Sequence, residues 1–170
     1  MSEKRDLKDI LERRRALFAR KPESAAYRPT ATTEWKGGLT NENRIRSHVI
    51  LSDYPVPSGG DDRAPNPMEM MLAALGSCVS AVYVEYAALL GVQLEAVSVE
   101  LSGEIDLRGL FNVADVSAGF QQVTYKTTLK TNSDKALVDE LIALAQAHCP
   151  VSTTMKLPTH VAPEVVVVKS

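Results

Sequence analysis

The chain has 170 residues, of which 45% are hydrophobic, so it is long enough to bury the core of one domain and short for two. Its 19 basic and 21 acidic residues nearly balance and are spread along the sequence, which disfavours nucleic acid or an anionic membrane surface as a partner. The first residues are charged and lack the apolar run of a secretory signal, so we expect a cytoplasmic, reducing environment.

The N-terminal residues predict a surface helix and a linker. Between residues 4 and 20 the apolar side chains recur with helical period, at Leu7, Ile10, Leu11, Leu17 and Phe18. The basic run 13–15 is interpreted as a solvated face of this helix. Residues 21–27 are predicted to be a linker, so residues 1–27 are separated from a domain that spans residues 28–170.

A hairpin and a long loop are expected next. Residues 30–35 are β-prone, Gly37 and Gly38 predict a turn, and residues 44–51 alternate well enough for a second strand. Residues 54–65 are rich in proline and glycine and lead directly into the following helix. A long loop in this position is often part of a pocket wall.

The following helix has the clearest boundaries in the sequence. Asn66 is the expected N-cap, Pro67 occupies the first turn, Glu69 completes a capping box, and Gly91 ends the helix. Residues 70–92 contain a single charged residue, Glu85, and are long enough to cross a bilayer. We interpret them instead as a buried core helix, because small and polar residues dilute the segment and no basic residues flank it.

The second half of the chain predicts further strands and one helix. Apolar and polar residues alternate over residues 97–106 and again over residues 123–130, and no element is predicted between residues 107 and 118. A helix is expected from Ser133 to His148, ended by Pro150, and a last strand over residues 161–168. The order β-β-α-β-β-α-β with alternating strands predicts a mostly antiparallel α+β domain.

Two cysteines, Cys78 and Cys149, are candidates for thiol chemistry. A buried thiol and a distant second thiol suit peroxide reduction, in which one sulfur attacks and the other resolves the sulfenic acid. Cys149 lies where the negative end of a helix dipole disfavours a thiolate, so Cys78 is the expected nucleophile and Cys149 the resolving thiol. This requires Cα atoms within roughly 7 Å. The alternative is that both are buried cysteines acting as small hydrophobic residues.

The helix dipole can do little for Cys78, which lies three turns inside its helix, so a cation has to come from elsewhere. Arg44 and Arg46, expected on one face of a strand, and Arg63 in the long loop are the candidates, and the sequence does not choose between them. Met68, Met71 and Leu72 are expected to form an apolar pocket wall that favours organic over hydrogen peroxide.

Other readings of the polar and sulfur-containing residues have weaker support. His48, His148 and His160 lack the spacing of zinc ligands, and no local signature supports a cysteine hydrolase with His160 as base. The methionines at positions 68, 70, 71 and 155 are interpreted as core filler rather than as a ligand set.

Several segments together resemble the OsmC/Ohr family of osmotically inducible and organic hydroperoxide resistance proteins. They are Trp35-Lys36-Gly37-Gly38-Leu39, Gly59-Gly60-Asp61, Pro65-Asn66-Pro67, Leu72-Ala73-Ala74-Leu75-Gly76-Ser77-Cys78 and Cys149-Pro150-Val151. The resemblance covers residues 28–168, and the segments Asp106-Leu107-Arg108-Gly109 and Gly119-Phe120-Gln121 resemble its OsmC-like branch.

The resemblance implies an intertwined homodimer with an OsmC-like α+β fold, two central buried helices and an active site at the subunit interface. It implies that Cys78 attacks an organic hydroperoxide, that Cys149 forms a disulfide with it, and that a dithiol such as a dihydrolipoyl protein restores both thiols. No metal or bound cofactor is implied. Two positions depart from the hydroperoxide-resistance pattern: Leu39 stands where those proteins have an arginine and Met68 where they have a glutamate.

The departures leave the activating groups open. Glu69 is the nearest acidic residue, but nine residues from Cys78 it falls on the opposite helix face, and its alternative role is the capping box. Arg44 or Arg46 would have to replace the missing arginine. The leading hypothesis is a thiol-dependent organic hydroperoxide peroxidase in oxidative-stress defence, and the alternatives are a non-catalytic small-molecule binding protein and a redox sensor on the same fold.

Overall fold

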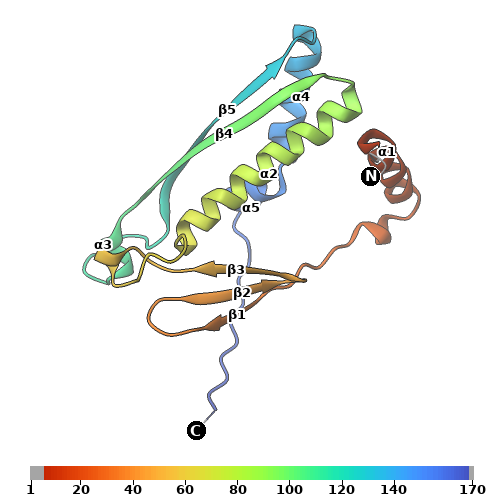
Figure 1. Ribbon diagram of the computed structural model, residues 1–170. Coiled ribbons are helices and arrows are strands. Elements are labelled where there is room, and N and C mark those ends of the chain that lie inside the picture. The colour runs from red at the N-terminus through yellow and green to blue at the C-terminus, as the bar shows by residue number, and fades with distance from the viewer. Residues whose placement is uncertain (1–5, 169–170) are drawn as a thin grey trace.

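The computed structural model describes residues 6–168 and confirms an α+β architecture with antiparallel sheets (Figure 1). A long hairpin of β4 (Leu94–Ile105) and β5 (Phe120–Thr131) forms the larger sheet. The central helix α2 (Pro67–Leu90) packs against β4, and α4 (Lys135–His148) packs against α2. The fully buried core lies where α2 and α4 meet, at Leu75, Val79, Val82, Tyr83, Ala87, Leu141, Ala145 and Cys149.

The β4–β5 hairpin buries one face, as the alternation of its sequence predicts. From Val97 on β4 and Val123 on β5, every second residue is at least half-buried, and Val99, Leu101 and Tyr125 are among those that pack on the α2–α4 core. Residues 107–118, for which no element is predicted, contain the short helix α3 (Leu107–Leu110) at the tip of this hairpin.

The prediction of an N-terminal hairpin is wrong in one detail, because the structure has a sheet of three strands there instead of two. Strands β1 (Thr32–Trp35) and β2 (Asn41–Ile45) are joined by the predicted glycine turn, but the predicted strand over residues 44–51 is divided into β2 and β3 (His48–Ser52). Arg46 has a positive φ of 55° and begins a tight turn there. Arginine is rare in this conformation, so alternation alone gave no signal of the turn.

The caps of α2 are those predicted. Asn66 Oδ1 accepts from the backbone N–H groups of Met68 and Glu69, at 2.9 and 3.0 Å, and Gly91 ends the helix with a left-handed backbone. Within residues 6–168, α2 is the one helix long and apolar enough to span a membrane by length and composition, a test that soluble core helices also pass. Its packing against β4 and α4 fits the core-helix interpretation.

The C-terminal part differs from the prediction in two ways. Pro150 does end α4, but it also begins another helix, α5 (Pro150–Lys156), because proline is well suited to a first helical turn. Residues 161–168, predicted to be a strand, are extended but pair with no strand in the described chain. Their valines are among the most exposed of the apolar side chains, at 76–85%.

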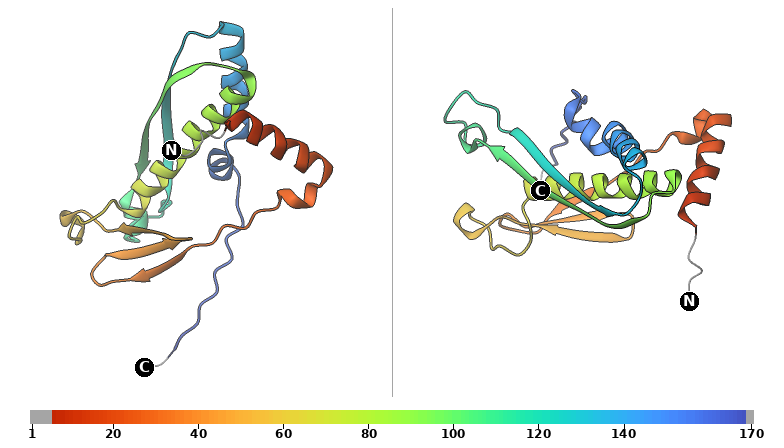
Figure 2. Two further views of the ribbon diagram at one scale, coloured as in Figure 1. Left: turned by 45° about the vertical axis from the view of Figure 1, so that its right-hand side comes forward. Right: turned by 90° about the horizontal axis from the view of Figure 1, so that it is seen from above.

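At the N-terminal end, α1 (Leu7–Arg20) confirms the predicted surface helix over its described part; residues 4 and 5 lie outside the described residues. The linker contains a short 3₁₀ helix, Pro22–Ala25. Figure 2 shows α1 beside the C-terminal end of α2 and away from the β1–β2–β3 sheet. No residue of α1 is buried, so the helix lies on the surface of the molecule.

Candidate functional site

The structure brings together two cysteines that are 71 residues apart in the sequence. Cys149 Sγ donates a hydrogen bond to Cys78 Sγ across 3.5 Å, and both sulfurs are free thiols. Cys149 is 1% exposed and belongs to the core, whereas Cys78 is half-buried at its edge. The predicted partnership of attacking and resolving thiols therefore has the necessary proximity, with the more accessible sulfur on Cys78.

Local sequence determines how Cys149 is held. It ends α4 with an extended backbone, as expected before a proline, and its carbonyl accepts from Thr153 N at 2.9 Å in the first turn of α5. Cys149 is thus the junction of two helices rather than only the end of one, which the expectation of a simple helix terminus missed. Pro150 turns the chain so that α5 packs against α2.

The surroundings of Cys78 favour the neutral thiol. Burial raises the pKa of Cys78 above its ordinary value, and the neighbouring Cys149 and Glu85 add to this increase. The backbone N–H of Val151, at the start of α5, acts in the opposite direction by stabilising a thiolate, but it does not outweigh burial. Within the described chain no cation contributes to the pKa of Cys78.

The three candidate arginines do not reach the thiols in the described chain. Arg44 is paired with Glu42 on the same strand, Arg46 lies in the β2–β3 turn, and Arg63 lies in the exposed loop before α2. The expectation that Arg44 and Arg46 share a strand face is wrong, because the strand ends at Ile45. None of these side chains forms a hydrogen bond or ion pair with Cys78 within residues 6–168.

Glu69 has the structural role that was the alternative to catalysis. Its Oε2 atom accepts from the backbone N–H of Asn66 at 2.8 Å, which completes the capping box of α2. No hydrogen bond joins it to Cys78 in the described residues, and Glu85 is the acidic residue whose charge influences the thiol. In the described chain Glu69 therefore caps α2.

The loop before α2 is organised by Asp53, which the sequence analysis did not single out. Asp53 is 1% exposed, and its Oδ2 atom accepts from the backbone N–H groups of Asp61 and Arg63 at 3.2 and 3.1 Å. Burial works to raise the pKa of Asp53, but the N–H donors of Tyr54, Arg63 and Asp61 outweigh it and hold the pKa below its ordinary value. An aspartate directly after a strand and before a loop rich in proline and glycine is a sequence signal that could have indicated this anchor.

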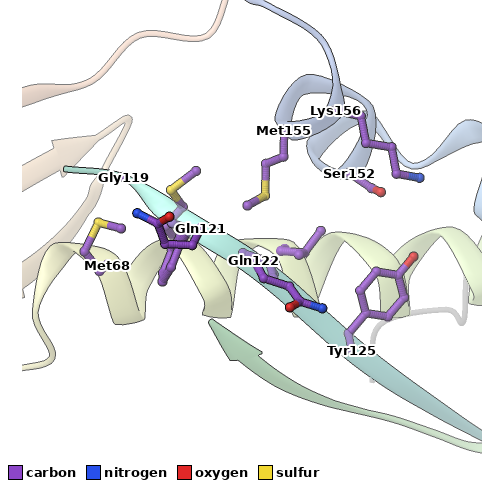
Figure 3. Close-up of a pocket in the computed structure, with 12 residues that line it drawn as sticks. Met68, Gly119, Gln121, Gln122, Tyr125, Ser152, Met155 and Lys156 are labelled. Carbon is purple, nitrogen blue, oxygen red and sulfur yellow. The ribbon is translucent and has the colours of Figure 1, made fainter. Parts of the chain in front are cut away.

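A cavity of about 510 Å³ lies between α2, β5 and α5 (Figure 3). We call it the methionine pocket, and its lining residues are Met68, Met71, Leu75, Gly119, Phe120, Gln121, Gln122, Val123, Tyr125, Ser152, Met155 and Lys156. Met68 and Met71 line it as predicted, but Leu72 does not. Met68 and Met71 border this open space and are not among the residues packed on the core, so the core-filler interpretation is wrong for them, whereas Met155 lines the pocket and also packs on the core.

Sequence reasoning missed the α5 and β5 sides of this pocket. Ser152, Met155 and Lys156 recur at the spacing of one helix face, a signal that was lost when Pro150 was read only as a stop. Cys78 does not line the cavity itself, but Leu75 lies one helical turn before it on α2 and Ser152 lies three residues after Cys149. The pocket therefore approaches the thiol pair from the N-terminal half of α2.

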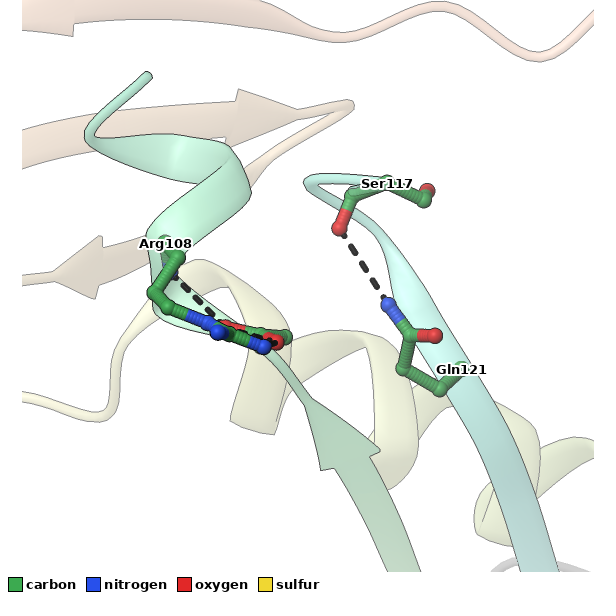
Figure 4. Close-up of polar contacts among 4 residues, drawn as sticks. Arg108, Ser117 and Gln121 are labelled. Carbon is green, nitrogen blue, oxygen red and sulfur yellow. Dashed lines mark hydrogen bonds and ion pairs between the residues drawn. The ribbon is translucent and has the colours of Figure 1, made fainter. Parts of the chain in front are cut away.

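Polar contacts fix the chain on both sides of α3 at the end of this pocket (Figure 4). Arg108 donates to Asp106 through Nε and Nη2, and this ion pair lowers the pKa of Asp106. Across the gap, Gln121 Nε2 donates to the Ser117 carbonyl at 3.3 Å. These bonds give structural roles to residues in both segments that resemble the OsmC-like branch.

The family model for OsmC-like proteins matches residues 59–164, which is more than half of the chain and includes both cysteines. The chain belongs to this family. The match begins at the loop before α2 and therefore excludes α1 and the β1–β2–β3 sheet. No match is found among curated proteins.

Solved structures agree on the fold. An OsmC-like protein from Mycoplasma pneumoniae is 16% identical with a TM-score of 0.62, covering 77% of this chain and 87% of that one. An organic hydroperoxide resistance protein OsmC from Legionella pneumophila is 21% identical with a TM-score of 0.59, covering 78% and 91%. One from Elizabethkingia anophelis is 18% identical with a TM-score of 0.58, covering 78% and 90%. These likenesses establish the OsmC-like fold.

Proposed function

We propose that the protein is a thiol-dependent peroxidase that reduces organic hydroperoxides in a reducing, cytoplasmic environment. The observation that carries the proposal is the 3.5 Å separation of Cys78 Sγ and Cys149 Sγ, close in sequence to Leu75 and Ser152 of the methionine pocket. Two free thiols this close can exchange two electrons with a substrate and end as one disulfide.

The reaction balances with these two residues. The Cys78 thiolate attacks the outer oxygen of the hydroperoxide, an S–O bond forms as the O–O bond breaks, and the leaving alkoxide takes a proton to become an alcohol. Cys149 then attacks the sulfenic sulfur, the S–O bond breaks, and water leaves as the disulfide forms. The Val151 N–H favours the thiolate form of Cys78 that the first step needs.

The methionine pocket supports an organic rather than an inorganic peroxide. Apolar side chains of Met68, Met71 and Phe120 can hold a hydrocarbon group, which hydrogen peroxide lacks. Neutral polar groups of Gln121, Gln122 and Ser152 lie in the same lining and can bind the oxygens of a substrate.

The missing cation is part of the proposal, and we assign it to a second copy of the chain. The β1–β2–β3 sheet, which carries Arg44 on β2 and Arg46 in the β2–β3 turn, makes few contacts with the other helices and strands of its own chain. Its apolar side chains Ile50 and Leu51 are 42% and 38% exposed, and the valines of residues 161–168 are more exposed still. A homodimer that covers these surfaces can bring an arginine of one subunit to Cys78 of the other.

A non-catalytic binding function is the second candidate, and one observation favours it. Within one chain the pKa of Cys78 is raised, whereas a peroxidatic thiol needs a lowered pKa. In that case the methionine pocket would bind an apolar ligand, and a variant with both cysteines replaced would bind it as well as the wild type does.

The deciding experiment treats the reduced protein with one equivalent of an alkyl hydroperoxide and follows intact mass and free thiols. We expect wild type to lose both thiols and two mass units, and Cys149→Ser to gain one oxygen at Cys78. Cys78→Ser is the matched control and should consume no peroxide above the background rate. Unreacted thiols in wild type, or full peroxide turnover by Cys78→Ser, would exclude the peroxidase.

A further inference from the structure

A second cavity, of about 440 Å³, lies beside the methionine pocket. We call it the tyrosine pocket, and its lining residues are Tyr83, Tyr125, Thr127, Leu129, Thr131, Val138, Ile142 and Gln146. They belong to α2, β5 and α4. Helix α4 packs on α2 but makes few contacts with β5, so the space between α4 and β5 stays open. Tyr125 lines both cavities and is their common wall.

The tyrosine pocket is separate from the thiol pair. Neither Cys78 nor Cys149 belongs to its lining. Tyr83 follows Cys78 by five residues on α2, which at about 100° per residue places the two side chains on different faces of the helix. A ligand of this cavity would therefore not compete with a peroxide for the sulfurs.

Three neutral polar side chains from three different elements meet in this cavity. Tyr83, on α2, is 4% exposed. Burial raises the pKa of its hydroxyl, whereas the nearby side chains of Thr127 on β5 and Gln146 on α4 act in the opposite direction. Tyr83 therefore keeps its proton at neutral pH and can donate a hydrogen bond.

The hydrogen bonding of this cluster is incomplete. Thr127 Oγ1 is buried and has no hydrogen-bond partner within residues 6–168. Thr131, two turns of the pleat away, is satisfied, because its hydroxyl donates to the Gln93 carbonyl at 2.7 Å. An unpaired buried hydroxyl is unfavourable, and folded proteins pair most such groups with protein, water or ligand atoms. Thr127 thus marks the point at which a ligand atom would supply a missing bond.

The rest of the lining favours an uncharged ligand. Leu129, Val138 and Ile142 provide apolar surface, and the rings of Tyr83 and Tyr125 can pack on a flat hydrocarbon. None of the described residues that line the cavity is charged. A carboxylate or an ammonium group would lose its hydration there without gaining an opposite charge. A neutral oxygen, in contrast, can bond to hydroxyl and amide groups.

We propose that the tyrosine pocket binds an uncharged, largely apolar molecule through one hydroxyl or carbonyl oxygen, which lies between Tyr83, Thr127 and Gln146. The hydrocarbon part of the ligand lies against the apolar side chains of β5 and α4. This site goes beyond the proposed peroxidase function and does not depend on it.

Four naphthalene probes test the chemistry of the site in the full-length, reduced protein at pH 7. 2-Naphthol carries a hydroxyl and 2-acetylnaphthalene a carbonyl, whereas naphthalene has no oxygen and 2-naphthoate is charged. Their affinities are measured by equilibrium dialysis. We expect at least one of the two neutral oxygen probes to bind about tenfold or more tightly than naphthalene and 2-naphthoate. The preferred oxygen probe shows whether the ligand has to donate as well as accept.

Variants of the lining locate the bound probe. Thr127→Val removes the unpaired hydroxyl and keeps the shape of the side chain, and Thr128→Val, exposed on the opposite face of β5, is the matched control. Val138→Trp fills the tyrosine pocket, and Met71→Trp fills the methionine pocket.

Thr127→Val should weaken binding of the preferred probe about five- to tenfold, the usual effect of one neutral hydrogen bond, and Val138→Trp should abolish it. Thr128→Val and Met71→Trp should bind within about twofold of wild type. Without ligand, Thr127→Val should unfold at the same urea concentration as wild type or a higher one, because it no longer buries an unpaired hydroxyl.

Three results would overturn the inference. They are the lack of saturable binding of both oxygen probes up to about 1 mM, equal affinity of Thr127→Val and wild type, and loss of binding in Met71→Trp but not in Val138→Trp. The last result would place the ligand in the methionine pocket. These measurements do not involve peroxide, so they stand whether or not the thiols prove to be peroxidatic.

Discussion

The two antiparallel sheets of this protein differ in what covers them. One face of β4–β5 packs on the α2–α4 core, and its alternating residues are half-buried as its sequence pattern requires. The β1–β2–β3 sheet has three consecutive apolar residues on β3, Val49, Ile50 and Leu51, and leaves all three exposed in the single chain. Strand periodicity therefore shows that an apolar face exists, but it does not show whether the same chain covers that face.

The first prediction tests whether a second subunit covers the β1–β2–β3 sheet. The largest effect on dimer stability should come from a charged substitution on this sheet. Ile50 and Leu51 are neighbours on β3, so they point to opposite faces. Placing a glutamate on the face that a second subunit covers should weaken the dimer about 100-fold or more, because the charge is buried without a partner. The same substitution on the other face should have little effect.

Sedimentation velocity of Ile50→Glu and Leu51→Glu measures this difference directly. One variant should dissociate and the other should remain dimeric, and each serves as the control for the other. A monomeric wild type, or two variants that both remain dimeric, would contradict the covered-sheet interpretation.

A second prediction concerns how the two regions cooperate at Cys78. In one chain, burial raises the pKa of the Cys78 thiol, so little thiolate exists at neutral pH. The thiolate fraction grows only as the pH approaches this raised pKa. An arginine from a partner sheet would lower the pKa. At pH 7, Cys78 of the dissociating β3 variant should therefore be alkylated about tenfold more slowly than Cys78 of the dimer for each unit by which dissociation raises its pKa. The two rates should converge at high pH.

Iodoacetamide alkylation between pH 6 and 10, in a Cys149→Ser background, measures the Cys78 thiolate alone. Arg44→Ala, Arg46→Ala and Arg63→Ala in the dimer then identify which arginine acts. Identical pH profiles for the dimer and the dissociated variant would mean that the sheet supplies no cation.

The elements around the thiol pair could largely be predicted from the sequence because their signals are local. The α2 caps, the β4 and β5 alternation and the placement of Cys149 after α4 each depend on residues close together in the chain. The β2–β3 turn at Arg46 and the helix after Pro150 were missed because each depends on a residue type that is compatible with more than one local structure. Arginine gave no turn signal, and proline both ends one helix and begins the next.

The candidate site was predictable only in part, for a related reason. Cys78, Cys149, Met68 and Met71 follow from their own segments, and the structure places them at the thiol pair or its pocket. The activating cation that we propose would come from a second subunit, which the sequence of one chain does not place. Residues of α5 and β5 enter the pocket only through tertiary packing, which periodicity in one segment does not encode.

A third prediction compares two glycines, one in each region. A Cβ on Gly60, in the loop after β3, would collide with the backbone of Tyr54, which has no freedom to move. A Cβ on Gly76, on α2, would lie 2.7 Å from Leu101 Cδ1, the end of a side chain that can change rotamer. Gly60→Ala should therefore lower the free energy of unfolding by about 3 kcal/mol and Gly76→Ala by about 1 kcal/mol.

Urea denaturation of both variants checks the order. A larger loss of unfolding free energy for Gly76→Ala than for Gly60→Ala would contradict the prediction. It would mean that the 54–65 loop adjusts to an added Cβ more easily than the packing of α2 on β4 does.

The smallest effect should come from Glu69, at the start of the helix that joins the two regions. Its carboxylate accepts from Asn66 N, so Glu69→Ala should cost about 0.5–1 kcal/mol of stability through the lost cap, while Glu69→Gln should retain most of it. Because Glu69 is occupied at the cap, neither variant should change the rate at which Cys78 reacts with an alkyl hydroperoxide. A large loss of the peroxide reaction rate in both variants, with stability nearly unchanged, would contradict this prediction. It would mean that Glu69 takes part in the reaction and that its bond to Asn66 N breaks during it.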